Sequence, residues 1–268
     1  MPFTLSHAAA IYPIRKIFKK RLPLSALIIG SFSPDFRYAV YSPELRDFSH
    51  SLEGLILFCL PVSLLGLFIF HFLIKKPLVQ LLPSFINDRI NPTQIQTEQL
   101  SWQKIIAVIL AIILGASSHS IWDSFTHSTG LAVQSIPLLK VSILKINSYD
   151  LRLYKFLQHA SSFLGVWFIF FWLKSWIKRT PRQESRNFQR FSETQKLKFW
   201  LAGGWLSIFI GILIGIWRIA PFSIGKGLRI FVVQTGIGML MAFTMFLIIF
   251  GLTVSIMDNK KAVMGEEN

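Results

Sequence analysis

Five stretches of mostly apolar residues divide the chain, covering residues 55–74, 105–122, 163–177, 199–219 and 230–257. A helix needs about 20 mostly apolar residues to cross the hydrocarbon core of a bilayer. Four stretches have about that length or more, and the third is shorter but rich in aromatic residues. The pattern therefore predicts an all-α protein, a polytopic transmembrane helix bundle with about five spans.

Polar segments separate these stretches. We expect connectors at 77–103 and 129–158, a strongly basic loop at 178–198 and a polar tail at 258–268. No internal repeat is visible in the sequence, so residues 1–268 are interpreted as a single membrane domain. Within it, 55–177 carry the first three spans and 199–257 carry the last two.

The first 54 residues follow a different pattern. Their apolar pieces are interrupted by Pro13, Pro23 and Pro34 and are too short to span a bilayer. We expect short helices that pack on, or partly sink into, one end of the bundle. The apolar segment 22–33 follows a basic stretch, as in a secretory signal, but that stretch starts late and Pro34 follows the only plausible cleavage residues. We therefore expect the segment to be retained.

Composition supports the membrane class. Hydrophobic residues make up 52% of the chain and charged residues 15%, against about 25% charged in average soluble domains. The net charge of +15 gathers at 15–21 and 174–198, where cations beside apolar stretches anchor helix ends and contact acidic headgroups. We expect membrane lipids as partners and no nucleic acid, since neither a basic–aromatic repeat nor zinc-finger spacing occurs. The single cysteine, Cys59, excludes a disulfide within the chain and a cysteine-based metal site.

The positions of Lys and Arg do not orient the predicted bundle. With five spans, residues 1–54, 123–162 and 220–229 lie on one side of the membrane. If Arg218 is counted with that side, each side holds 14 of the 28 cations. Only the dense segment 174–198 favours the second side as the cytoplasmic one.

Five of the six histidines fall near one face of the predicted membrane domain. This follows from parity, because the first span crosses in one direction and the second crosses back. Histidines precede the first span, end the second and precede the third, namely His7, His50, His119, His127 and His159. His71 alone lies near the opposite face.

Two aspartates join these histidines. Asp123 lies between His119 and His127, four residues from each, so the three side chains share one face of a helix. Asp35 follows Pro34 in the N-terminal segment. An imidazole and a carboxylate on adjacent turns can hold one divalent ion, and an ionisable residue near hydrocarbon indicates a functional site. The predicted metal ligands are His7, Asp35, His50, His119 and Asp123.

Other interpretations of this set remain open. His–Asp hydrogen bonds between helices can simply stabilise a bundle. A serine hydrolase can be drawn from the serines around the histidines, although no G-x-S-x-G motif occurs. Haem between His119 and a facing histidine is a further alternative.

Several stretches resemble a bacterial membrane family known only as domain of unknown function 4184. They are the opening MPFTLSHAA, the segment GSFSPD at 30–35, HSLEG at 50–54 and LQHASS at 157–162. The resemblance covers most of the chain. It implies a multi-pass protein of the bacterial inner (plasma) membrane and no established activity.

A more distant likeness concerns the order of the polar residues. The predicted ligands match, in order, the motifs of the YdjM-like inner-membrane metal-dependent hydrolases, and the order is also similar to zinc-dependent phospholipase C. The chain departs from both, because Phe36–Tyr38 replace an Asp and a His of the first family and Phe163 stands where the second has a Glu. His127 and His159 can fill the later histidine positions of the phospholipases. The resemblance implies a zinc site with one or two ions.

The first functional hypothesis is a membrane-embedded, metal-dependent hydrolase of a phosphoester, with a lipid as a fitting substrate. His127 and His159 are then the predicted catalytic acid–base residues, with Arg37, Arg46 and Arg152 as candidate phosphate ligands. The alternative is a scaffold or transporter with a structural or transported ion. The last two spans carry almost no polar residues, which argues against transport.

Overall fold

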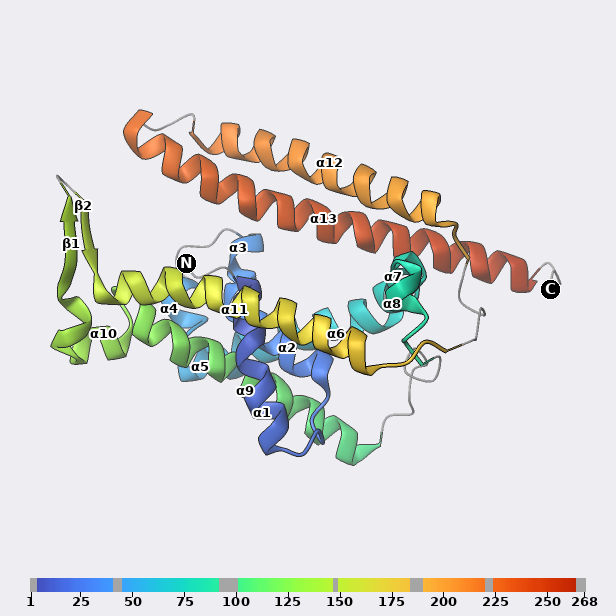
Figure 1. Cartoon of the computed structure of the whole chain (residues 1–268), viewed down its shortest axis with the longest axis horizontal. Helices are drawn as coiled ribbons and strands as arrows, with labels where there is room; N and C mark the ends of the chain where they lie inside the picture. Colours follow the sequence, from blue (N-terminus) through green and yellow to red (C-terminus); the bar gives the residue numbers. More distant parts are fainter. Residues whose placement is uncertain are drawn as a thin grey trace. The chain divides into compact units, whose positions relative to one another are not determined.

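The computed structural model describes residues 4–40, 45–91, 101–146, 149–183, 190–219 and 224–263. The chain forms two compact units, one of Met1–Leu67 with Gln99–Arg179 and one of Phe68–Glu98 with Thr180–Asn268. Both are almost entirely helical, which confirms the predicted fold class (Figure 1). Five helices are long and apolar enough to cross a membrane: Leu52–Leu81, Trp102–Ser135, Leu153–Arg179, Glu193–Arg218 and Ile230–Asp258.

The first long helix contains two π-helical turns. Its parts are α5 (Leu52–Gly54), π turn η3 (Leu55–Cys59), α6 (Leu60–Ile69), π turn η4 (Phe70–Ile74) and α7 (Lys75–Leu81). Pro61 comes two residues after the first π turn ends, and Pro77 comes three residues after the second. A proline is tolerated in the first turn of a helical segment, where its missing N–H leaves no bond unmade. The predicted connector beginning at residue 77 is therefore wrong in its first residues, because the helix continues to Leu81.

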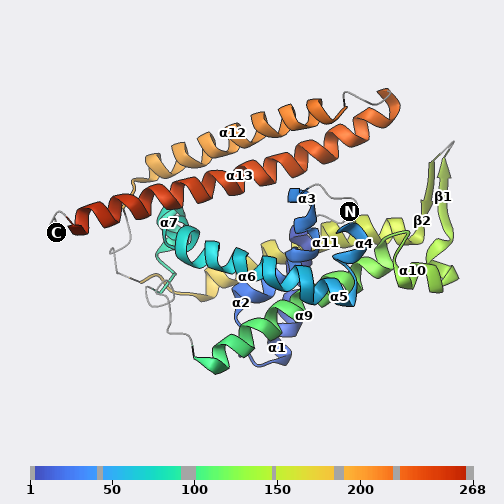
Figure 2. The ribbon, with the colours of Figure 1, turned by 180° about the vertical axis from the view of Figure 1, so that it is seen from behind.

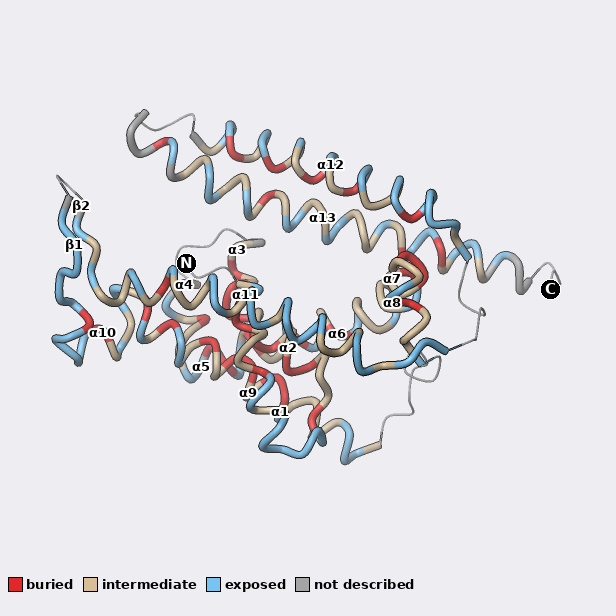
Figure 3. Tube along the Cα trace, viewed as in Figure 1, coloured by how far each residue is buried: buried red, intermediate tan, exposed pale blue. Residues whose placement is uncertain are grey.

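The first unit is organised around a close crossing of α2 (Leu24–Phe32) and α9 (Trp102–Thr126). A Cβ atom added to Gly30 would lie 2.5 Å from the Ile112 carbonyl oxygen, and one added to Gly115 would lie 2.8 Å from the Ser31 amide nitrogen. Only glycines at these positions allow the two backbones to touch, as in other closely packed membrane helices. Leu27 and Ile112 are fully buried beside this contact. Buried residues gather in this part of the unit (Figure 3).

The N-terminal segment forms short helices, as predicted. They are η1 (Thr4–Ala10), α1 (Ile11–Ile17), α2, η2 (Ser33–Phe36), α3 (Arg37–Val40) and α4 (Leu45–Phe48). Between α1 and α2 the chain turns through Lys19 and Lys20, which have positive φ values of 48° and 62°. The backbone of η1 lies directly on α11 (Leu153–Arg179), where a Cβ on Gly165 would come within 2.8 Å of the Ser6 Cβ.

The segment after α9 contains more structure than the sequence predicted. It holds α10 (Leu131–Ser135), η6 (Pro137–Lys140) and an antiparallel hairpin of β1 (Ser142–Ile146) and β2 (Tyr149–Arg152). Helix α11 begins directly after this hairpin, at Leu153. The predicted connector to residue 158 is therefore wrong over its last six residues. Lys155 and Gln158 interrupt the apolar pattern there, so hydrophobic length alone does not extend the predicted span to Leu153.

The second unit is dominated by α12 (Glu193–Ile219) and α13 (Ile224–Val263), which lie side by side (Figures 1 and 2). Glycines again allow close contact: a Cβ on Gly203 would meet the Phe246 ring, and one on Gly211 would lie 2.7 Å from the Thr235 carbonyl oxygen. The unit also contains η4, α7 and α8 (Ser84–Asn87). An ion-pair network joins Lys76 and Arg190 to Asp258, at 3.2 and 2.7 Å.

Candidate metal centre

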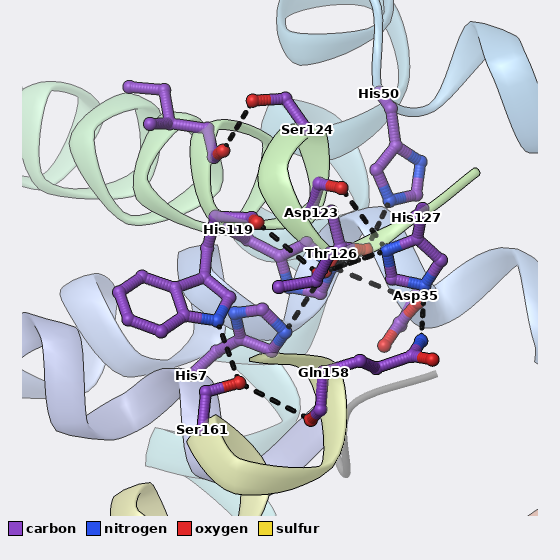
Figure 4. Close-up of polar contacts among 12 residues, drawn as sticks. His7, Asp35, His50, His119, Asp123, Ser124, Thr126, His127, Gln158 and Ser161 are labelled. Carbon is purple, nitrogen blue, oxygen red and sulfur yellow. Dashed lines mark hydrogen bonds and ion pairs between the residues drawn. The ribbon is translucent and has the colours of Figure 1, made fainter. Parts of the chain in front are cut away.

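Four histidines and two aspartates meet inside the first unit (Figure 4). We call them the His/Asp cluster. It consists of His7 from η1, Asp35 from η2, His50 from the turn before α5, His119 and Asp123 from α9, and His127 at the end of α9. The structure thus brings together six of the seven residues that the sequence predicted for a site, from η1, η2, the turn before α5 and α9.

Asp123 lies at the centre of the cluster. One carboxylate oxygen, Oδ2, is 3.4 Å from His50 Nε2 and 3.4 Å from His119 Nε2. The other, Oδ1, is 3.5 Å from His7 Nε2 and 3.4 Å from His127 Nδ1. The spacing of four residues along α9 accounts for two of these neighbours, and the folding of the N-terminal segment brings the other two.

The crossing of α2 and α9 fixes the orientation of His119. One turn beyond Gly115, the Nδ1–H of His119 donates to the Ser31 carbonyl oxygen at 2.7 Å. This bond leaves Nε2, with its lone pair, directed at Asp123 and, 3.9 Å away, at Asp35 Oδ1. A ligating histidine is usually held in this way by a bond to its other nitrogen.

Asp35 and His50 are held by hydroxyl groups. The Thr4 hydroxyl donates to Asp35 Oδ2 at 2.6 Å. His50 Nδ1 lies 3.0 Å from Ser49 Oγ, so its Nε2 is turned toward Asp123. The turn that carries His50 is itself bonded to η3, because the Cys59 thiol donates to the Ser49 carbonyl oxygen at 3.3 Å. The sequence singled out neither Thr4 nor Cys59 for this supporting role.

His127 is bound on both sides of its ring. Its Nδ1 is 3.2 Å from the Asp123 carbonyl oxygen, and its Nε2 lies 3.1 Å from Gln158 Nε2. The Lys155 ammonium donates to Gln158 Oε1, which assigns the amide nitrogen of Gln158 as the donor to His127. His127 therefore carries its proton on Nδ1 and presents it to Asp123.

His159 does not reach the cluster in the described structure. It is exposed on α11, while its neighbour Gln158 is 1% exposed and points inward. Which of two adjacent residues faces inward depends on the rotation of the helix about its axis, and the sequence does not fix that rotation. The catalytic role of His159 stays a prediction.

The predicted phosphate ligands have other partners. Arg37 donates to the Tyr38 hydroxyl and lies over that ring, 3.9 Å from its centre. Arg152 pairs with Asp150 in the hairpin at 2.9 Å. The side chain of Arg46 lies outside the described residues.

Three buried atoms of the cluster make no hydrogen bond within the described parts of the chain. They are His7 Nε2, His119 Nε2 and Asp123 Oδ1. A buried polar atom without a hydrogen bond normally costs about 1–3 kcal/mol, and these three lie 3.4–3.5 Å from other atoms of the cluster, as a group that could hold one metal ion. The pKa of His7 is lowered to about 3, first by burial and then by the neighbouring His119. His7 is thus neutral at physiological pH, as a metal ligand must be.

The spacing of these atoms fits a metal ion. Two ligands about 2.1 Å from a tetrahedral ion lie about 3.4 Å apart, close to the distances around Asp123. Two three-residue groups have ligand atoms within 4.8 Å of one another: His7, His119 and Asp123, and Asp35, His50 and His119. His119 belongs to both, and its ring stacks on that of His7 at 3.7 Å between ring centres.

Comparison with known proteins gives a family but no activity. No curated protein and no solved structure matches the chain. The likeness to YdjM-like hydrolases and zinc-dependent phospholipase C is therefore only a pattern of residues. A family model described as "Domain of unknown function (DUF4184)" matches residues 1–252, and the chain belongs to that family.

Proposed function

We propose that the His/Asp cluster binds a divalent metal ion and that the protein is a membrane-embedded, metal-dependent hydrolase of phosphoesters, including those of lipids. The observation that carries the proposal is the convergence of three buried, unbonded ligand atoms from His7, His119 and Asp123. Five apolar helices long enough to cross a membrane support its location in a bacterial inner membrane.

Zinc fits the donor set best. The cluster offers imidazole nitrogens and carboxylate oxygens, whereas magnesium and calcium prefer sites made of oxygen alone. His119, Asp123 and His7 form one three-ligand set, and three protein ligands leave a fourth position for water or substrate. A second ion, if bound, would be held by the other three-residue group, Asp35, His50 and His119.

The bound ion supplies Lewis acidity and lowers the pKa of a coordinated water toward neutrality. The chain supplies orientation and proton transfer. His127 presents its Nδ1 proton to Asp123 and is 19% exposed, against 2% for His7, so it is the proposed general acid–base. His159, exposed one residue from Gln158, is the second candidate for that role.

A structural ion is the competing function, and one observation favours it. His7, His119 and Asp123 are all almost fully buried, as in closed structural sites. An enzyme needs access to the ion, which the more exposed His50 and His127 offer on the other side of Asp123.

Metal analysis of protein purified without chelator tests the proposal. We expect one or two zinc ions per chain in wild type, and loss of metal in Asp123→Asn and His119→Gln. His71→Gln is the matched control, because this histidine lies in η4 of the second unit and should leave the metal content unchanged. Metal-free wild type would overturn the proposed site.

Phosphodiester hydrolysis is then measured on the same samples, with lipid and water-soluble substrates. Turnover that follows metal content across the variants supports the enzyme. Full metal content without turnover on either panel favours the structural ion.

A further inference from the structure

A pocket of about 460 Å³ lies beside the cluster, between η1–α1 and the helices α9 and α11. Its lining includes small residues, among them Ala9, Ala10 and Gly165. Large side chains such as Tyr12, Trp122 and Phe168 form its walls. Its size falls within the range of small-molecule sites, about 300–1,000 Å³.

The pocket meets the cluster at His7. His7 lines the pocket and also contacts Asp123 at 3.5 Å. Beside it the Trp122 indole N–H donates to the Ser161 hydroxyl at 3.2 Å. A tryptophan with one polar and one apolar side is typical of the boundary between headgroups and hydrocarbon.

The other walls face the apolar surroundings of the spans. Leu164 and Phe168 on α11 are 56% and 40% exposed, and neighbouring residues of the same helix are exposed apolar side chains. An exposed apolar surface of this kind on a long apolar helix is covered by lipid. The molecules with access to the pocket from that side are therefore lipids, and the part that fits its walls is an acyl chain.

We propose that this pocket binds one acyl chain of a membrane phospholipid, with the glycerophosphate group toward His7. The idea that this lipid is the substrate rests on the proposed function, because it places the phosphoester beside the cluster. Lipid binding in the pocket does not depend on that function.

Photo-crosslinking tests lipid binding independently of metal. The protein is placed in nanodiscs with a phospholipid that carries a diazirine in its acyl chain, and cross-linked peptides are identified by mass spectrometry. We expect cross-links at Tyr12, Leu164 and Phe168. Leu164→Trp fills the pocket and should reduce its cross-links at least fivefold. Val166→Trp is the matched control, because Val166 is exposed on the same helix and does not line the pocket.

Cross-links that are spread evenly over α11, or that survive Leu164→Trp, would overturn the acyl-chain site. If the purified protein contains no metal but still shows the specific cross-links, the proposed hydrolase activity is overturned while the lipid-binding site is supported. If both proposals hold, Leu164→Trp raises KM for a long-chain phospholipid far more than KM for a water-soluble phosphodiester, whereas Val166→Trp leaves both unchanged.

A separate observation concerns the side of the membrane on which the cluster lies. Ser6 lies on Gly165, and Tyr12 packs edge-to-face on Phe168 with ring centres 5.5 Å apart. Helix α1 crosses α11 steeply, and its contacts move along α11 away from Gln158 (Figure 1). Ile14 and Leu22, on either side of the turn that follows α1, pack in one apolar group with Ala107 and Val108, near the start of α9.

The direction of α1 places the basic turn between α1 and α2 away from the cluster. Its cations are Arg15, Lys16, Lys19, Lys20 and Arg21. They lie toward the end of the first unit that also holds Lys104, at the start of α9, and Lys174, near the end of α11. Five of the 14 cations that parity assigned to the cluster's side thus belong to the opposite side. The geometry points to a cytoplasmic basic turn and a cluster on the outer side of the membrane.

Labelling with a membrane-impermeant maleimide tests this orientation. Lys20→Cys and Ser128→Cys are each introduced into a Cys59→Ala background; both positions are exposed, and Ser128 follows His127. We expect Ser128→Cys to react from the outside and Lys20→Cys only after permeabilisation. Labelling of both from one side, or the reverse pattern, would overturn the orientation.

Discussion

The two units use the same packing device for different ends. In the first, Gly115 lets α9 touch α2, and the contact places the Ser31 carbonyl against His119. In the second, Gly203 and Gly211 let α12 approach α13. The contacts there are with the Phe246 ring and the backbone of α13, and no metal-binding group was found in the described residues of that unit. Close packing through glycine thus stabilises the α12–α13 helix pair in the second unit, whereas in the first unit it orients His119.

The largest effect is expected from Asp123→Asn. The amide keeps the shape of the side chain but removes the charge that four histidines surround, so zinc affinity should fall at least 100-fold. Isothermal titration with zinc measures it. Asp258→Asn, which removes a carboxylate from the ion-pair network of the second unit, should leave zinc affinity unchanged. An equal loss of zinc affinity in Asp123→Asn and Asp258→Asn would show that zinc binding is not specific to the His/Asp cluster of the first unit.

Gly115→Ala separates orientation from stability. The new methyl group would collide with the α2 backbone, part the two helices and lengthen the bond from His119 to Ser31. Loss of such an orienting bond typically costs about 10–100-fold in metal affinity. Gly211→Ala creates a comparable collision in α12–α13 and should lower thermal stability while metal affinity stays at the wild-type value. A Gly115→Ala protein with full zinc affinity would contradict the orienting role of the crossing.

Gln158→Ala and His159→Ala compare two adjacent residues of α11. Gln158 donates to His127 Nε2, so its removal frees that ring and should lower zinc affinity or turnover about tenfold. His159 is exposed, and its replacement should change zinc affinity less than twofold. If His159 is a catalytic base, turnover alone falls in His159→Ala, with a changed pH profile.

The smallest effect concerns pH and His7. Its pKa is about 3 in the folded protein and 6.5 in the unfolded chain, so below pH 6.5 the unfolded chain binds the extra proton. Metal-free protein should therefore lose up to about 1.4 kcal/mol of stability per pH unit as the pH falls from 6.5 toward 3. Denaturant unfolding at several pH values measures this slope, which should be shallower in His7→Asn. An unchanged slope would contradict the burial of a neutral His7.

Much of this architecture could be predicted from residue patterns. Hydrophobic length predicted five spans, and the spacing of four residues placed His119, Asp123 and His127 on one face of α9. Parity then brought His7 and His50 to the same end. The rest depends on how the helices cross, which no periodicity in the sequence encodes. Helix crossings set the inward position of Gln158, the bond from Thr4 to Asp35 and the position of the basic turn away from the cluster.

The separation of the cluster residues along the chain has a consequence for biosynthesis. His7 and Asp35 leave the ribosome early, whereas Asp123 follows His7 by more than 100 residues. Until α9 has entered the membrane and met α2, the N-terminal helices lack the Asp123 carboxylate around which the four histidines gather. An ion in this cluster would therefore be acquired only after α9 has been inserted, and its binding free energy would stabilise only chains in which this second long helix already contacts the N-terminal segment.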